Sequence, residues 1–160
     1  MSAALSSILA KSDNTLWKGD MGNAASVPRE AILVVDDDPE VLSVAADILR
    51  TAGYTVLSTG DPRAALRLAR THPEPLHLLL ADVVMPLMGG RQLAEELGAI
   101  RPDTKVLFMS AYNIESVEAY RIQLAPGEPF LAKPFTMTEL EDTVRAALTY
   151  HAPRSRQGVQ

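Results

Sequence analysis

Five short apolar runs recur along the chain, at residues 32–35, 54–58, 76–81, 105–109 and 130–132. Each is rich in aliphatic or β-branched residues and is apolar nearly throughout, rather than at alternate positions. Continuous runs of this length are typical of strands that are buried on both faces, as in parallel sheets. The pattern therefore predicts five buried strands.

Between the runs, apolar residues recur every three or four positions, which is the period of an amphipathic helix. The spacing is clear in every gap except the one after the fourth run, where it is weaker. Asp38 followed by Pro39, and Asp61 followed by Pro62, each combine an N-cap side chain with a proline suited to the first helical position. Gly53 is placed to end the first helix. Strands and helices are thus predicted to alternate.

Such an alternation indicates an α/β fold, because parallel neighbouring strands need crossover connections and the crossover helices then cover the sheet. We predict a doubly wound, five-stranded parallel sheet of the flavodoxin-like (βα)5 type, with strand order 2-1-3-4-5. The domain is expected to span residues 30–150. Residues 1–29 mix Ser, Ala, Asn, Gly and Lys and are predicted to be a flexible N-terminal tail, and the polar residues 151–160 a C-terminal tail.

Composition narrows the functional classes. The 160 residues are 47% hydrophobic and 22% charged, with a net charge of −5 and no cysteine. The acidic balance argues against a nucleic-acid-binding surface, and the lack of cysteine excludes disulfides, thiolate zinc sites and cysteine nucleophiles. No apolar run approaches the ~20 residues that span a membrane, and no signal peptide is expected at the N-terminus. We expect a cytoplasmic protein without nucleic-acid or membrane partners.

Polar residues that suit phosphoryl chemistry follow four of the predicted strands. Asp36 and Asp37 follow the first strand, Asp82 the third, Ser110 the fourth and Lys133 the fifth. Sites in open α/β sheets form at the carboxyl ends of the strands, where the strand order reverses. With the predicted order, three carboxylates converge there and repel one another unless a cation lies between them. Carboxylates without His or Cys favour Mg²⁺ or Mn²⁺, which also bind phosphate oxygens.

Each of these residues, taken alone, has a commoner interpretation. Asp36 and Asp82 could be turn or cap residues, Ser110 a turn former and Lys133 a solvated side chain, and Asp38 is interpreted as a helix cap only. What favours a functional site is their conjunction, because four different strands deliver suitable residues to the same edge of the sheet.

Four segments of the chain resemble, in order and spacing, the receiver domain of two-component response regulators. They are ILVVDDDPEVL (32–42), LLLADVVMPLMGG (78–90), VLFMSAY (106–112) and FLAKPF (130–135). The last two are most similar to receivers attached to hybrid sensor histidine kinases. The resemblance implies a phosphoacceptor that takes a phosphoryl group from a histidine kinase or a histidine phosphotransfer protein. No kinase or effector domain is recognised, so a stand-alone receiver that signals by protein–protein interaction is expected.

The resemblance also assigns roles around the acidic residues. Asp82 matches the phosphoacceptor, Asp37 a direct metal ligand, and Asp36 an acid that holds the metal through water. The backbone carbonyl of Val84 matches the third protein ligand. Asp36, Asp37, Asp82 and Val84 would together hold Mg²⁺ or Mn²⁺.

Residues after the fourth and fifth strands are implied to bind and sense the phosphoryl group. Ser110, Ala111 and Lys133 match phosphoryl-binding positions, and the peptide between Lys133 and Pro134 is expected to be cis. Ser110 and Phe130 match a switch pair, in which Ser110 moves toward the new charge and Phe130 enters the space it leaves.

The expected output surface is the face made by the fourth helix (115–124), the fifth strand and the last helix. Its change of partner preference would pass the signal to a downstream protein, and a dimer that forms on phosphorylation is a further expectation. The chain is not expected to be an enzyme, beyond catalysing its own aspartyl phosphorylation and dephosphorylation.

Two further positions are expected to tune the rate of phosphoryl loss. Val84 offers no polar side chain to position a water molecule, which predicts slow self-dephosphorylation, and Tyr112 is either a second such position or a packing residue. Gly90 matches a loop glycine of the receiver family, whereas Gly89 stands where that family often has Asp, a change expected to be minor.

Three alternatives remain open from the sequence. A haloacid-dehalogenase-type phosphatase would use Asp36 as nucleophile and Asp38 as partner, but it would leave Asp82 without a role. A flavodoxin-like cofactor site would place an anionic group against acids rather than against a phosphate loop. A receiver-like adaptor would act through binding alone, without phosphorylation.

Overall fold

A computed structural model describes residues 29–111 and 127–152. The elements along these residues are β1 (Ala31–Val35), α2 (Pro39–Thr51), β2 (Thr55–Thr59), α3 (Pro62–Thr71), β3 (Leu78–Asp82), α4 (Gly90–Ile100), β4 (Lys105–Ser110), β5 (Phe130–Ala132) and α6 (Met137–Thr149). The predicted fourth helix (115–124), Tyr112 and most of both predicted tails lie outside the described residues.

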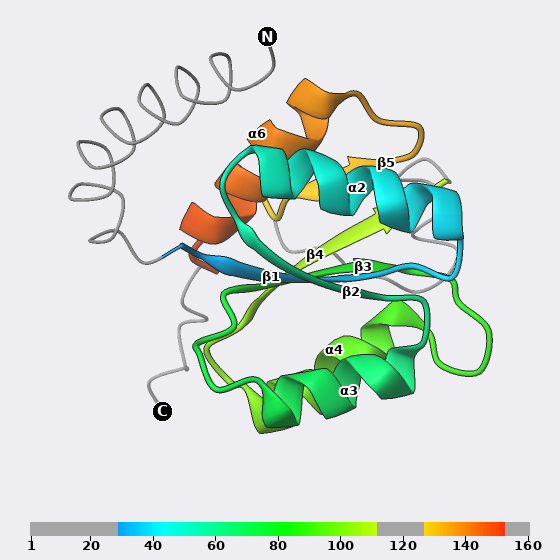
Figure 1. Ribbon diagram of the computed structural model, residues 1–160, viewed down its shortest axis with the longest axis vertical. Coiled ribbons are helices and arrows are strands. Elements are labelled where there is room, and N and C mark those ends of the chain that lie inside the picture. Colours follow the sequence, from blue (N-terminus) through cyan, green and yellow to red (C-terminus); the bar gives the residue numbers. More distant parts are fainter. Residues whose placement is uncertain (1–28, 112–126, 153–160) are drawn as a thin grey trace, which may run out of the picture.

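The strands form one parallel sheet in the order β2-β1-β3-β4-β5, which confirms the predicted fold class and strand order. The helices α2 and α6 cover one face of this sheet, and α3 and α4 cover the other (Figure 1). The order reverses between β1 and β3, so these two strands are the neighbours whose carboxyl ends define the expected site.

Burial explains why the central strands were readable as continuous apolar runs. Every residue of β1 and of β3 is buried, since each strand has a helix layer on both faces. Three strands begin one or two residues away from their predicted starts: β1 at Ala31 rather than 32, β2 at Thr55 rather than 54, and β3 at Leu78 rather than 76. His77 therefore lies just before β3, where its Nδ1 atom accepts a hydrogen bond from the Ala31 N–H at 2.9 Å.

Local caps begin and end the helices as the sequence predicts. The Asp38 side chain accepts hydrogen bonds from two N–H groups at the start of α2, and Asp61 accepts one at the start of α3, each with proline as the first helical residue. Gly53 follows α2 with a φ of 101°, a conformation that glycine adopts without strain. These positions are decided by neighbouring residues, and this is why they could be predicted.

A long-range contact joins the ends of two helices. The Arg101 guanidinium, just after α4, donates hydrogen bonds to the backbone carbonyls of Ala69 at 2.8 Å, of Glu74 at 3.4 Å and of His72. These carbonyls belong to the last turn of α3 and to the segment that leads into β3. Arg101 thus satisfies acceptors that the end of α3 leaves without helical partners.

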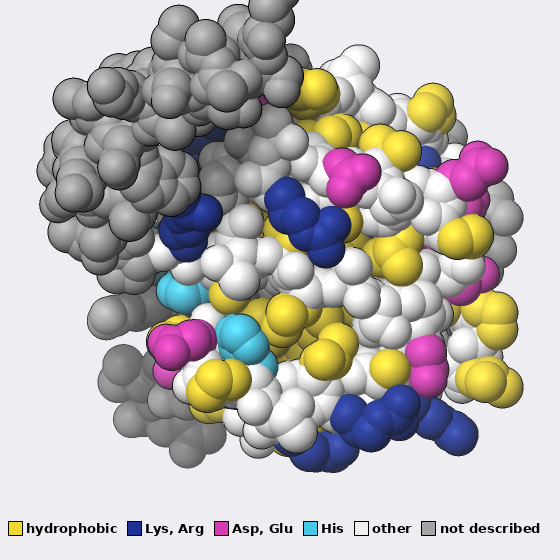
Figure 2. Space-filling model, in the orientation of Figure 1, with side chains coloured by type: hydrophobic (Ala, Val, Ile, Leu, Met, Phe, Trp, Pro, Cys, Tyr) yellow, Lys and Arg dark blue, Asp and Glu magenta, His cyan; other side chains and the backbone are white. Residues whose placement is uncertain are grey.

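Surface charge is uneven in spite of the acidic total. Arg63, Arg67 and Arg70 are exposed and recur every three or four residues, so they form a basic strip along α3 that is visible at the bottom of Figure 2. Only Arg67 among them has an acidic partner in the described part of the chain, Asp61 at 3.9 Å. The opposite side of α3 packs on the sheet, so the strip is the solvated face of an amphipathic helix. Within the described residues no helix is both long and apolar enough to cross a membrane.

Candidate functional site

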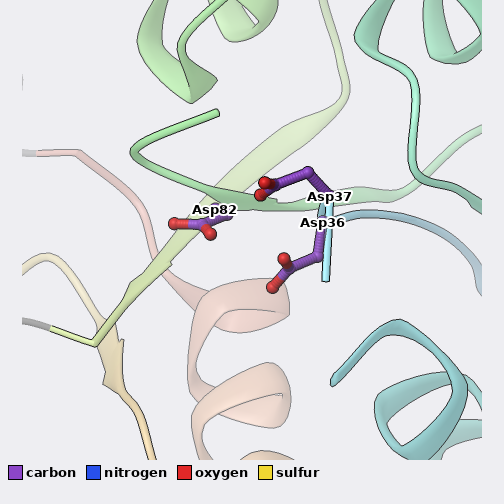
Figure 3. Close-up of side chains that lie close together, drawn as sticks. All are labelled: Asp36, Asp37 and Asp82. Atoms are coloured by element: carbon purple, nitrogen blue, oxygen red, sulfur yellow. The ribbon is translucent and has the colours of Figure 1, made fainter. Parts of the chain in front are cut away.

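The carboxyl ends of β1 and β3 bring three acidic side chains together. Asp36 and Asp37 directly follow β1, and Asp82 is the last residue of β3. Each contributes a carboxylate oxygen to a group in which these oxygens all lie within 4.8 Å of one another (Figure 3). The convergence predicted from the strand order is therefore present.

The three acids differ in exposure and in partners. Asp36 is fully buried, with Oδ1 accepting from the Asp38 N–H at 2.9 Å and Oδ2 accepting from Lys133. Asp82 is 8% exposed. Asp37 is exposed, and it has no hydrogen-bond or ion-pair partner among residues 29–111 and 127–152. Asp37 is therefore the carboxylate best placed to take a new ligand directly.

Lys133 links the end of β5 to the two buried acids. Its Nζ atom donates to Asp82 Oδ2 at 3.1 Å and to Asp36 Oδ2, and its side chain is only 13% exposed. The residues are separated by 51 and 97 positions in the sequence. The backbone N–H of Lys133 also donates to the carbonyl of Ser110 at 2.8 Å, which joins the ends of β4 and β5 beside the acids. The peptide between Lys133 and Pro134 is cis, as expected.

Burial and ion pairing shift the ionisation of this pair. Burial raises the pKa of Asp36 above its ordinary value of 3.8, although the hydrogen bond from Lys133 opposes the shift. Burial alone would lower the pKa of Lys133, but its hydrogen bonds to Asp36 and Asp82 outweigh that effect and raise the pKa above 10.5. Lys133 is therefore a fixed cation at neutral pH, and a further positive charge nearby would stabilise the ionised form of Asp36.

The carboxylate of Asp82 is held in a defined direction. Its Oδ1 atom accepts a hydrogen bond from the Val84 N–H at 3.2 Å, while Oδ2 is bound by Lys133. The Val83 N–H donates to the carbonyl of Met109 at 3.0 Å and so anchors the start of the following loop to β4. Asp82 therefore presents a positioned oxygen pair beside Asp36 and Asp37.

The start of α4 packs directly on the backbone of Asp82. A Cβ atom added to Gly90 would lie 2.1 Å from the Asp82 carbonyl oxygen and 2.9 Å from its carbonyl carbon. Only glycine allows this approach, which gives a steric reason for the loop glycine that the family resemblance implied. At Gly89 an added Cβ would lie 3.3 Å from the carbonyl oxygen of Val83, a tight but much smaller contact.

The remaining predicted residues surround this centre. Ser110 is 2% exposed at the end of β4, Ala111 follows it on the surface, and the side chain of Val84 is 43% exposed. Phe130 is half-buried in β5 and pairs in register with Phe108 of β4, against which it packs together with Val83.

Phe108 was not among the residues predicted from the sequence. Its signal was present in the sequence, since it lies two residues before Ser110 and so faces the same side of the sheet. A second unpredicted feature is an apolar hollow of about 240 Å³ beside Lys133, lined mainly by Val41, Val44, Pro134 and Phe135. This hollow joins residues of α2 to the segment between β5 and α6.

The acidic set fits a hard divalent cation. Its donors are oxygens from three carboxylates, without His or Cys, and one of the three is exposed and without a partner in the described residues. Such a set is typical of Mg²⁺, which keeps several waters and binds through one or two carboxylates plus phosphate oxygens. The same geometry disfavours Asp36 as a phosphatase nucleophile, because that side chain is fully buried and out of reach of a substrate.

Comparisons with known proteins agree with this geometry. Residues 32–145 match the response regulator receiver domain family. The sensor kinase CckA of Brucella abortus is 30% identical over 141 residues, which are 88% of this chain and 14% of that protein. The chain spans 14–53% of the length of the curated relatives it matches.

Two solved structures extend the comparison. The receiver domain of the hybrid histidine kinase CckA is 33% identical with a TM-score of 0.61, covering 74% of this chain and 99% of that one. A Burkholderia pseudomallei response regulator, solved with a phosphorylated aspartic acid, calcium ion and citrate, is 26% identical with a TM-score of 0.59, covering 75% of this chain and 66% of that one. The family match, the strand order and the acidic group at the β1–β3 edge show that this chain belongs to the response regulator receiver domains of two-component systems.

Proposed function

We propose that the chain accepts a phosphoryl group on Asp82 from a phosphohistidine protein and signals through the change that follows. The observation that carries this proposal is the setting of the Asp82 carboxylate, which is bound by Lys133 and by the Val84 N–H and lies beside Asp36 and Asp37. The similar Burkholderia protein contains a phosphorylated aspartic acid, which supports the same chemistry here.

A divalent cation, Mg²⁺ or Mn²⁺, belongs to the proposal. Asp37, Asp82 and the carbonyl of Val84 would bind it directly, and Asp36 would bind it through water. The cation would supply positive charge to the phosphoryl oxygens. The convergence of the three carboxylate oxygens within 4.8 Å supports this assignment.

Several side chains at the site would take part in phosphoryl transfer. A carboxylate oxygen of Asp82 forms the new P–O bond while the P–N bond of the phosphohistidine breaks, and the electron pair of that bond returns to the imidazole nitrogen. The product is an acyl phosphate. Lys133, already a cation at this carboxylate, neutralises phosphoryl charge, and Ser110 and Ala111 bind the phosphoryl oxygens.

The phosphoryl group would be sensed through β4 and β5. Movement of Ser110 toward the new charge would open space for Phe130, whose register partner Phe108 forms part of the surface it packs against. The output face would include β5 and α6, and it would bind a downstream protein or a second copy of the chain; the segment 115–124, also expected there, lies outside the described residues.

Phosphoryl loss would be slow in this proposal. Val84 is exposed beside Asp82 and has no polar side chain to position water, and Tyr112, the second rate-tuning position, lies outside the described residues. In this proposal the chain acts as a cytoplasmic signalling domain and not as an enzyme on other substrates. The absence of cysteine from all 160 residues suits a reducing compartment.

Labelling with radioactive acetyl phosphate in Mg²⁺ tests the proposal. We expect an acid-stable, base-labile label on the native chain that is lost with EDTA and in Asp82→Asn. Asp47→Asn is the matched control, because Asp47 is an exposed acid on α2 with a 73% exposed side chain, and we expect it to be labelled normally. No label on a folded native chain from acetyl phosphate or from any phosphorylated kinase would favour the adaptor alternative instead.

A further inference from the structure

The loop between β3 and α4 contains a strained residue. Leu87 has a φ of 70°, and it is the one residue other than glycine with a positive φ in the described part of the chain. The Met88 N–H donates to the carbonyl of Pro86 at 2.8 Å, so Leu87 is the central residue of a three-residue γ-turn. With positive φ this is the rare and strained form of the turn, and a bulky side chain there is unusual.

The side chain of Leu87 is too exposed for packing against the fold to offset this strain. It is 93% exposed, the largest exposed fraction among the large hydrophobic residues of the described chain. Glycine or asparagine would adopt the same backbone with less strain and without an apolar group in water. Strain of this kind at a functional edge indicates a role outside the folded chain itself.

Leu87 is also part of a wider pattern. The described residues contain four exposed large hydrophobic side chains, at Val44, Val84, Leu87 and Met137. Val84 and Leu87 lie in the loop that follows Asp82, and Met137 is the first residue of α6, just after Lys133 and its neighbours. The loop projects beyond the carboxyl edge of the sheet in Figure 1, and hydrophobic side chains stand out at the same right-hand rim in Figure 2.

The position of the loop indicates which protein would contact Leu87. A protein that transfers its phosphoryl group to Asp82 must bring the group into bonding contact there, so its surface covers the loop that begins at the next residue. On the other side of Asp82, the apolar hollow of about 240 Å³ lies between α2 and the segment before α6. The loop leads instead to α4, on the opposite face of the sheet, so a donor that covers the site contacts both sides of Asp82.

We propose that Leu87 is an apolar anchor for the protein that donates the phosphoryl group, because its strained γ-turn holds a fully exposed leucine at the rim of the acceptor site. Leu87 and the hollow would contact the donor on opposite sides of Asp82. To receive Leu87, the donor must carry an apolar recess beside its phosphohistidine. This inference rests on the proposed function of Asp82. Burying a leucine changes an equilibrium constant by roughly tenfold to a hundredfold, so the anchor would act mainly on the KM for the donor.

Transfer kinetics from a protein donor, measured against acetyl phosphate, test this role. Purified histidine kinases and phosphotransfer proteins of the source organism are phosphorylated, and the donor with the highest kcat/KM for the native chain is selected. For Leu87→Asn we expect the ratio of kcat/KM with the protein donor to the acetyl phosphate rate to fall at least about tenfold, through KM. Leu87→Met keeps an apolar side chain and is the matched control, with a ratio expected to remain within about threefold of native.

Thermal unfolding separates this role from a structural one. Leu87→Asn should unfold at the same temperature as the native chain or higher, because it relieves strain and removes no packing. An unchanged ratio for Leu87→Asn overturns the inference, as does an equal loss with both donors. Labelling of the native chain by acetyl phosphate but by none of the protein donors also overturns it while leaving the Asp82 proposal standing. Failure of both donors on the native chain would overturn the Asp82 proposal itself.

Discussion

Replacement of Gly90 by alanine should disturb the acceptor residue from the side of its backbone. Gly90 is the first residue of α4, and an added Cβ would lie 2.1 Å from the carbonyl oxygen of Asp82. Real Cβ atoms essentially never approach another heavy atom closer than 3.0 Å, so the two backbones must separate by about 0.9 Å. Neither atom belongs to a flexible side chain that could move aside.

The size of the effect follows from this forced separation. Overpacking of a well-packed site costs typically about 1–3 kcal/mol, and a backbone clash belongs at the upper end, so we expect a loss of about 2–3 kcal/mol. For a chain of this length that corresponds to roughly 5–10 °C in the unfolding temperature. A misplacement of about 1 Å at a reacting group can slow a reaction about a hundredfold, so phosphoryl acceptance by Asp82 should fall by a factor of roughly 10–100.

Gly98 provides the matched control in the same helix. It is exposed, and an added Cβ there has no other heavy atom within 4 Å. Alanine at such a site in a helix stabilises by about 0.5–1 kcal/mol relative to glycine, so Gly98→Ala should unfold later than the native chain. The same substitution is thus expected to have opposite signs eight residues apart.

Urea unfolding followed by far-ultraviolet circular dichroism measures the change in stability, and the rate of labelling by acetyl phosphate measures the change in phosphoryl acceptance. The m-value should stay constant in both variants if only stability changes. A Gly90→Ala protein with native stability and a native labelling rate would refute the argument that α4 positions Asp82 through this contact.

Three further predictions concern other contacts of the fold. Lys133→Met leaves two buried carboxylates without their cation, so urea unfolding at pH 7 should show a free energy of unfolding about 3 kcal/mol lower than that of the native chain. Mg²⁺ should reduce this loss, and so should acid, because Asp36 becomes protonated. Equal stability of the two proteins at pH 7 without Mg²⁺ would contradict this. Arg101→Met leaves carbonyls at the end of α3 without donors and should lower the free energy of unfolding by about 2 kcal/mol in the same assay. Arg101→Lys should recover only part of this stability, and full recovery by lysine would argue against the contact with three carbonyls. Hydrogen bonds from Thr136 lower the pKa of Glu139 below 4.5, so the stabilisation by its charge is complete above that pH and is lost as the pH falls through the lower folded-state value. The difference in urea midpoint between native and Glu139→Gln should therefore shrink between pH 5 and pH 3, and a constant difference would exclude a contribution from the charge.

Local features of the fold were predictable because their causes are local. The strands β1 and β3 are buried on both faces, so nearly every residue in them must be apolar, and this leaves a pattern that needs no knowledge of the neighbours. The caps at Asp38 and Asp61 depend on N–H groups within three residues. The starts of β1, β2 and β3 differed by one or two residues, because the pairing that begins a strand, such as Ala31 with Thr55, depends on a neighbouring strand.

The acidic site was predictable for a related reason. Parallel strands all end at the same edge of a sheet, so residues that follow different strands meet there once the strand order is known. This was enough to bring Asp36, Asp37 and Asp82 together from the sequence. It could not indicate that Asp36 is fully enclosed while Asp37 is exposed, because burial depends on what packs over each side chain.

The sequence by itself therefore determined the order of the elements, the edge of the sheet that carries the chemistry, and the residue types present there. Only the tertiary structure decided how those residues are held. Lys133 reaches Asp36 across 97 positions and Gly90 accepts no Cβ because of the Asp82 carbonyl. The strained turn at Leu87 depends in the same way on the path of a whole loop. Such contacts join segments whose distance in space is set by the packing of the entire sheet and its helices, and no local pattern in the chain records that distance.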